Sequence, residues 1–106
     1  METKEIIVLN LGLDNLDIYE GVSIESVGGR KTINLTQDNL NLIKRNIKKY
    51  IRKVTQCAFS NSAIVLTGAI AIPVYLTALC IALEYFAEIK YKNEMLELVI
   101  DSTEGE

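Results

Sequence analysis

An uncharged run of 24 residues, SNSAIVLTGAIAIPVYLTALCIAL at positions 60–83, constrains this chain more than any other feature, because 24% of all its residues are charged. About 20 apolar residues are enough to cross a bilayer as one helix, so the run is long enough for a membrane span. It also divides naturally into a short buried strand, a tight turn at Thr67-Gly68 and an apolar helix that starts near Pro73. The two interpretations define different classes of protein.

The order of residue types within the run favours the divided interpretation. Bulky, mostly β-branched residues come first (IVL at 64–66), as in a strand that is buried on both faces. Gly68 then permits a sharp turn with positive φ, and Pro73 suits the first turn of a helix. Good helix formers, Ala and Leu, dominate after the turn. We therefore predict strand, turn and helix, and keep a single-pass membrane protein with residues 60–83 in the bilayer as the alternative.

The composition bounds the remaining possibilities. A chain of 106 residues is large enough for one domain with its own hydrophobic core, which we predict over residues 1–100, followed by an acidic tail at 101–106. The net charge of −3 argues against general affinity for nucleic acid, so no DNA partner is expected. Because histidine is absent, an imidazole base and a His–metal site are both excluded.

The cellular location is predicted from the N-terminus and the cysteines. Residues 1–5 are largely charged and lack the pattern of a secretion signal. Cys57 and Cys80 both lie in apolar stretches, which is typical of reduced thiols in the core of an intracellular protein. We therefore expect a cytoplasmic protein without stable membrane association.

The rest of the chain predicts further strands and one long helix. Gly28-Gly29 is a strong hairpin signal, Asn93-Glu94 is a turn candidate, and Thr36 is placed to cap a helix. The predicted strands span 5–13, 17–27 with a kink at Gly21, 30–35, 63–66, 88–92 and 95–100, and the predicted helices span 37–57 and about 73–86. The expected fold class is α/β, a small mixed sheet with two helices in the order ββ(β)αβαββ, in which the second helix makes a right-handed parallel crossover.

The predicted helix 37–57 is amphipathic. Its apolar residues recur every three or four positions and form one face. Its opposite face carries six of the eleven basic residues of the chain, Lys44, Arg45, Lys48, Lys49, Arg52 and Lys53. The simplest interpretation is a solvated outer face. The alternative is a non-catalytic interaction module in which this helix meets RNA or DNA, an acidic protein or lipid head groups.

The turn Thr67-Gly68-Ala69 is the best candidate for binding chemistry. In α/β sheets, ligands collect beyond the carboxyl ends of parallel strands, where free amides before the next helix attract anions. A Thr hydroxyl, a Gly that permits close approach and the small residues that follow suit a phosphate or a ribose. A tight turn that only packs a helix onto a sheet is the plainer alternative.

Cations are expected near this turn. Lys90 and Lys92 share one face of a predicted strand, and Asn10 with Arg30 or Lys31 would add polar groups at the same edge of the sheet. The dinucleotide fingerprint, the P-loop lysine and a carboxylate cluster for metal are all missing from the sequence. No metal and no cofactor is therefore predicted.

Four short motifs in the second half of the chain, VLTG at 65–68, IPVYL at 72–76, IKYK at 89–92 and LELVI at 96–100, carry a family resemblance. They resemble the small accessory proteins of type III CRISPR systems, the CARF-like ring nucleases that bind cyclic oligoadenylate. In that family a strand ends in a Thr/Ser-Gly turn, a helix that opens with Pro follows, and a strand hairpin closes the sheet. The close likeness covers about 40 residues, and the rest of the chain agrees only in the order of its elements.

The resemblance implies a CARF-like, Rossmann-like fold that binds a cyclic oligoadenylate. The symmetry of such a ligand and the amount of apolar surface in so short a chain predict a homodimer with the ligand at its interface. Metal-dependent members carry histidines and an acidic-basic hairpin turn, whereas this chain has no histidine and has Asn93-Glu94 in that turn. We therefore expect a sensor, a sink or a slow metal-independent ring nuclease in antiviral signalling, in which the RNA's own 2′-hydroxyl attacks the neighbouring phosphate. No catalytic residue is assigned. The expected ligand-binding residues are Asn10, Thr67, Gly68, Ala69, Lys90 and Lys92.

Overall fold

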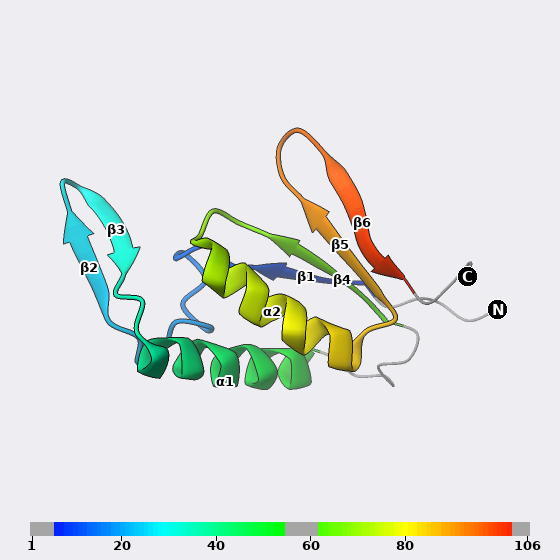
Figure 1. The fold of residues 1–106 in the computed structure, drawn as a ribbon, viewed down its shortest axis with the longest axis horizontal. Helices are drawn as coiled ribbons and strands as arrows, with labels where there is room; N and C mark the ends of the chain where they lie inside the picture. The colour runs from blue at the N-terminus through cyan, green and yellow to red at the C-terminus, as the bar shows by residue number, and fades with distance from the viewer. Residues whose placement is uncertain (1–5, 55–61, 103–106) are drawn as a thin grey trace.

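Strands and helices alternate along the chain in the computed structural model, which describes residues 6–54 and 62–102 (Figure 1). Four strands form a mixed sheet in the order β1-β4-β5-β6, and β2 and β3 form a separate two-stranded sheet. The predicted α/β class, with two helices and a small mixed sheet, is confirmed. The elements are β1 (Ile6–Asn10), β2 (Ile24–Val27), β3 (Arg30–Ile33), α1 (Gln37–Val54), β4 (Ala63–Thr67), α2 (Ile72–Tyr85), β5 (Glu88–Lys92) and β6 (Glu97–Ser102).

The uncharged run folds as two elements. Its first part is the buried strand β4, Gly68 turns the chain with a φ of 106°, and α2 begins at Ile72 with Pro73 in its first turn. The prediction of strand, turn and helix is therefore confirmed, and a single span over residues 60–83 is wrong. Within residues 6–54 and 62–102, no helix combines the length and the apolar character needed to cross a membrane.

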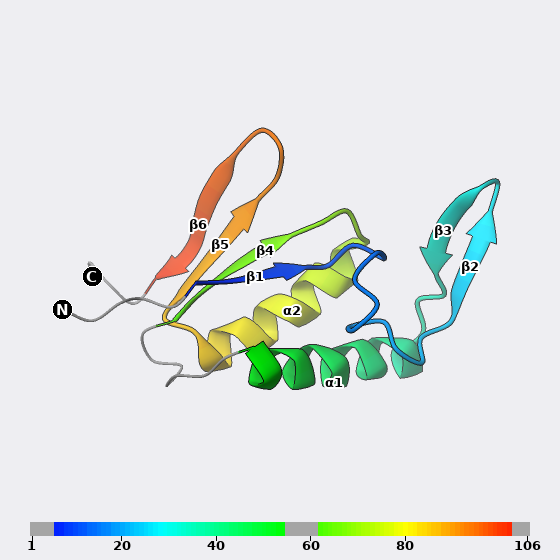
Figure 2. The ribbon, with the colours of Figure 1, turned by 180° about the vertical axis from the view of Figure 1, so that it is seen from behind.

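Both helices cover the same face of the four-stranded sheet. β1 pairs in parallel with β4, and β4 pairs in parallel with β5, so each helix connects two neighbouring parallel strands. Because both connections step across the sheet in the same direction and have the same hand, the two helices lie on one side of it (Figures 1 and 2). β6 then returns antiparallel to β5 as a hairpin, as predicted.

The other face of the sheet is not covered by either helix. The register places Val8, Val65, Lys90 and Val99 in one row across the four strands on this side, which we call the open face. Val8 and Val99 are each 56% exposed. Parallel sheets normally have both faces covered, so an open face that carries valines is an unusual feature.

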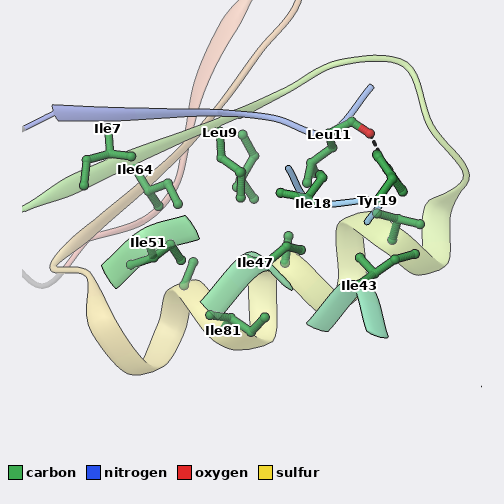
Figure 3. Packing of buried hydrophobic residues seen from close by; sticks show 14 of the residues in the cluster. Ile7, Leu9, Leu11, Ile18, Tyr19, Ile43, Ile47, Ile51, Ile64 and Ile81 are labelled. Carbon is green, nitrogen blue, oxygen red and sulfur yellow. Dashed lines mark hydrogen bonds between the residues drawn. The ribbon is translucent and has the colours of Figure 1, made fainter. Parts of the chain in front are cut away.

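The hydrophobic core lies between the sheet and the two helices. Ile7 and Leu9 from β1 and Ile64 from β4 point toward the helices, where Ile47 of α1 and Ile81 of α2 meet them (Figure 3). All five side chains are buried, and Leu9, Ile64 and Ile47 are completely so. The apolar face predicted for the first helix is therefore confirmed as its core-facing side.

The N-terminal cap of α1 is also confirmed. The backbone N–H of Asn39 donates to the hydroxyl of Thr36 at 3.1 Å, which satisfies one of the amides that the first turn of a helix leaves without a partner. Residues 55–57, which complete the predicted helix, lie outside the described residues.

The strand predicted over residues 17–27 is wrong in its first half, because only Ile24–Val27 forms β2. Residues 16–22 form consecutive turns instead, with Tyr19 N–H donating to Leu16 and Val22 N–H donating to Tyr19. Ile18 and Tyr19 are adjacent and both buried, whereas neighbouring residues of a strand point to opposite faces. The buried side chain of Asn46 on α1 holds this segment, because its amide donates to the carbonyls of Ile18 (3.1 Å) and Glu20 (2.9 Å).

Four other predicted features differ from the structure. β1 ends at Asn10 rather than at residue 13, and β6 reaches Ser102, two residues into the predicted acidic tail. The Gly28-Gly29 turn forms as predicted, with φ of 58° and 81°, but its hairpin stands apart from the main sheet (Figure 1). Cys80 is a free thiol, yet it is exposed on α2, so the prediction of a core position is wrong; Cys57 lies outside the described residues.

Candidate functional site

The loops that follow β1 and β4 touch at the carboxyl end of the sheet. The N–H of Leu11 donates to the carbonyl of Thr67 at 2.7 Å, and the N–H of Gly12 donates to the side-chain oxygen of Asn10 at 2.9 Å. A Cβ atom added at Gly68 would lie 2.5 Å from that Asn10 oxygen and 2.5 Å from the Gly12 nitrogen. Gly68 is therefore required by its positive φ and by the close approach of the two loops.

A cavity of about 760 Å³ opens beside this contact, between the turn after β4 and the loop that joins β5 to β6. It is lined by Val8, Thr67, Gly68, Ala69, Tyr91, Lys92, Asn93, Glu94 and Met95. Four of the six sequence-predicted binding residues are in this lining: Thr67, Gly68, Ala69 and Lys92. Asn10 and Lys90 are not.

Thr67 ties the ends of β4 and β5 together. Its hydroxyl donates to the backbone carbonyl of Lys92 at 2.7 Å. The hydroxyl hydrogen is therefore in use, while the lone pairs of the oxygen remain able to accept a hydrogen bond. This arrangement suits a ligand hydroxyl, such as that of a ribose, better than a phosphate oxygen, which would need the donated hydrogen.

The groups suited to an anion are two backbone amides and one lysine. The N–H groups of Gly68 and Ala69 donate to no protein atom in the part of the chain that the structure describes. The ammonium group of Lys92 is exposed and has no ion-pair partner among those residues. Glu94 is also a lining residue, and its negative charge offsets that of Lys92, so the net electrostatic attraction of the cavity for an anion is small.

Lys90 and Asn10 are engaged elsewhere. The Lys90 ammonium lies 3.5 Å from the Glu97 carboxylate and 4.0 Å from that of Glu88, all on the open face. The side-chain amide of Asn10 donates to both carboxylate oxygens of Asp14, at 3.1 and 3.2 Å. Asn10 therefore shapes the loop beneath Gly68 and does not line the cavity.

Arg30 and Lys31 also do not line the cavity. Both residues belong to β3 of the β2–β3 hairpin, which forms a separate sheet and is not part of the carboxyl edge of the main sheet. Neither Arg30 nor Lys31 therefore joins Lys92 in the cavity lining, contrary to the expectation from the sequence.

An aromatic pair that the sequence did not single out supports the cavity wall. The rings of Tyr75 on α2 and Tyr91 on β5 meet edge to face, with centroids 5.7 Å apart at 64°. The Tyr75 hydroxyl donates to the carbonyl of Gly68, so α2 is tied to the turn that precedes it. Burial, with a smaller contribution from Tyr91, raises the pKa of Tyr75 and keeps this hydroxyl protonated.

The β5–β6 loop that forms the far wall is shaped by Asn93. Its side-chain oxygen accepts the N–H groups of Met95 (2.8 Å) and Leu96 (3.0 Å), and its backbone N–H donates to the Leu96 carbonyl at 3.0 Å. The predicted turn at Asn93-Glu94 is confirmed.

Within the described ranges, no group of three or more Asp, Glu, Cys or His side chains is arranged to hold a metal ion. No protein-family model, curated protein or solved structure matches this chain. The function must therefore be argued from the cavity itself.

Proposed function

We propose that the cavity binds a nucleotide ligand and that this ligand is a cyclic oligoadenylate. The observation that carries the proposal is that Gly68 and Ala69, whose N–H groups have no protein partner in the described ranges, line one cavity together with Lys92 and Tyr91. Amides and a lysine suit a phosphate, and an aromatic face suits a base. The volume of about 760 Å³ is within the range of small-molecule sites, roughly 300–1,000 Å³.

The proposal includes a CARF-like, Rossmann-like relationship, a cytoplasmic location and a role as sensor, sink or slow ring nuclease. Cleavage would proceed without a metal: a ribose 2′-oxygen bonds to the adjacent phosphorus as the bond to the 5′-oxygen breaks, and the 5′-oxygen takes up the proton. The Gly68 and Ala69 amides would stabilise the charge that develops on the phosphate oxygens. Slow turnover is expected because no histidine is present to transfer the proton.

A homodimer is part of the same proposal, and we place its interface on the open face of the sheet. Val8 belongs both to that face and to the cavity lining, so a second copy packed there would border the cavity. The charges of Lys90, Glu88 and Glu97 on this face are already paired with one another, which lowers the cost of covering them. Sheets that pack face to face bury their apolar rows in this way.

The test of ligand binding uses titration with cyclic oligoadenylates of different ring size, with linear oligoadenylate as the competing ligand. Lys92→Glu should weaken binding at least tenfold, whereas Lys31→Glu, the same charge change in the distant hairpin, should bind as the unmodified protein does. Absence of binding at micromolar protein, or equal weakening in both variants, would overturn the proposal.

The test of the dimer uses sedimentation of two matched variants. Val99→Lys places a charge on the open face, whereas Val27→Lys places the same charge on an exposed valine of β2. We expect the protein and Val27→Lys to sediment as dimers and Val99→Lys as a monomer. A monomeric unmodified protein at micromolar concentration contradicts the proposed interface.

A further inference from the structure

α2 is apolar on both of its sides, although the domain buries only one. Its inner side, Val74, Ala78, Ile81 and Ala82, packs in the core. On its outer side Ile72, Leu76 and Leu83 are 73%, 56% and 54% exposed. These three residues are spaced by four and seven positions, so they share one helix face and form a continuous ridge. A helix that is hydrophobic all round normally has both sides covered.

α1 lies beside α2 and carries the opposite kind of surface. Its outer side presents the six basic residues Lys44, Arg45, Lys48, Lys49, Arg52 and Lys53, and its only acidic residue is Asp38 in the first turn. None of the six forms an ion pair with any residue in the described ranges. The two helices contact each other and lie on the same side of the sheet (Figures 1 and 2). Each ridge is on the side of its helix opposite the buried residues, so we infer that the apolar ridge and the basic ridge are neighbours.

We propose that this surface, the outer side of α1 and α2, docks on an anionic lipid membrane. The apolar ridge of α2 would enter the boundary between head groups and acyl chains, while the basic side chains of α1 would contact lipid phosphates and carboxylates. α2 has 14 residues, about 21 Å at 1.5 Å per residue, and is therefore too short to cross a hydrocarbon core of about 30 Å. It would lie in the plane of the membrane.

The charge distribution selects this partner over the others. A nucleic acid would match the basic ridge of α1 and leave the apolar ridge of α2 uncovered. A second copy of the same surface would cover the α2 ridge and leave the α1 cations unpaired. An anionic bilayer offers an apolar layer and a negative layer side by side, so it matches both ridges at once. The proposal is independent of the nucleotide site and revises the sequence-based expectation of no stable membrane association.

The first test measures flotation with vesicles of phosphatidylcholine alone and of phosphatidylcholine with phosphatidylserine. The protein should bind the anionic vesicles, and added salt should release it. Each basic side chain near such a surface contributes about a fivefold factor to the partition coefficient, so Lys49→Glu/Arg52→Glu should weaken binding about thirtyfold or more. Arg30→Glu/Lys31→Glu, the same charge change on the distant hairpin, should bind as the unmodified protein does.

The second test measures insertion with a polarity-sensitive fluorophore on Cys80, the exposed thiol of α2, in a Cys57→Ser background. Its emission should shift to the blue on anionic vesicles, and Leu76→Glu should abolish the shift. The same label on Val27→Cys, in a background that also carries Cys80→Ser, should not respond.

Four results would overturn the proposal. Two come from the vesicle experiments. The first is no binding to anionic vesicles, and the second is equal binding to neutral vesicles together with unchanged binding of the Lys49→Glu/Arg52→Glu variant. The third is a blue shift of the Cys80 label that appears without lipid as protein concentration rises, because it would identify a second copy on α2. The fourth is tight, salt-sensitive binding to random RNA or DNA duplex without vesicle binding, which would assign α1 to nucleic acid.

Discussion

Replacing Gly68 with alanine tests whether the loops after β1 and β4 meet beneath the cavity. Gly68 has a φ of 106°, and a Cβ there would lie 2.5 Å from the Asn10 side-chain oxygen and 2.9 Å from the Leu11 nitrogen. Strain in such a backbone region costs about 1–3 kcal/mol, and overpacking costs about 1–3 kcal/mol more. We therefore expect the free energy of unfolding to fall by about 2–6 kcal/mol, measured by urea denaturation at fixed protein concentration.

Gly28→Ala is the matched control for Gly68→Ala. Gly28 also has a positive φ, 58°, but a Cβ there meets no atom within 4 Å, so only the backbone cost of about 1–2 kcal/mol applies. Adding Asn10→Ala to Gly68→Ala removes one of the close contacts and should recover part of the loss. If Gly68→Ala costs no more than Gly28→Ala, the close approach of the two loops is not what fixes glycine at this turn.

Three further predictions concern the loop, the buried tyrosine and the cavity. Asn46→Ala should lower the free energy of unfolding by about 2–4 kcal/mol and expose the segment around Ile18 to protease, because the buried carbonyl of Ile18 and the partly buried carbonyl of Glu20 lose their donor. Burial raises the pKa of the Tyr19 hydroxyl, so with rising pH the unfolded state loses this proton before the folded state does. The free energy of unfolding should therefore fall as the pH rises above 10.0. In Tyr19→Phe, denaturation measured over the same pH range should lack the part of this fall that Tyr19 causes. Glu94→Gln should tighten cyclic oligoadenylate binding severalfold in the same titration, because it removes the negative charge from the lining.

The elements that the sequence predicts correctly are those with short-range causes. Gly68 and Pro73 mark the turn and the helix start, Thr36 marks a cap and Gly28-Gly29 marks a hairpin, all through local backbone geometry. The segment around Ile18 is different, because its carbonyls are held by Asn46, 28 residues further along the chain. No local pattern records such a contact, so the loose alternation of apolar and polar residues over 17–27 predicts a strand where the structure has turns.

The residues near the candidate site also differ in whether their position has a short-range or a long-range cause. Thr67, Gly68 and Ala69 line the cavity together, and the sequence predicts their turn because a strand-to-helix turn is a local feature. Lys90 does not line the cavity, and its partner Glu97 depends on the register of the β5–β6 hairpin, which shifts between Ile89 and Lys90 and which no local pattern predicts. Which face of the sheet stays open depends on strand order and crossover hand together, so the sequence alone did not predict it.

The two surfaces proposed for partners follow from one property of the uncharged run. α2 is apolar on both sides, and apolar residues also lie on both faces of the sheet around β4, but the two helices cover only one face of the sheet and the domain buries only one side of α2. The sides left over, the open face of the sheet and the outer ridge of α2, are on opposite sides of the molecule (Figures 1 and 2). A second copy bound to the open face of the sheet therefore leaves the outer ridge of α2 free, so dimerisation and membrane binding do not compete. A variant such as Val99→Lys that loses the dimer should for this reason keep its affinity for anionic vesicles per protomer, whereas a shared interface would make both fail together.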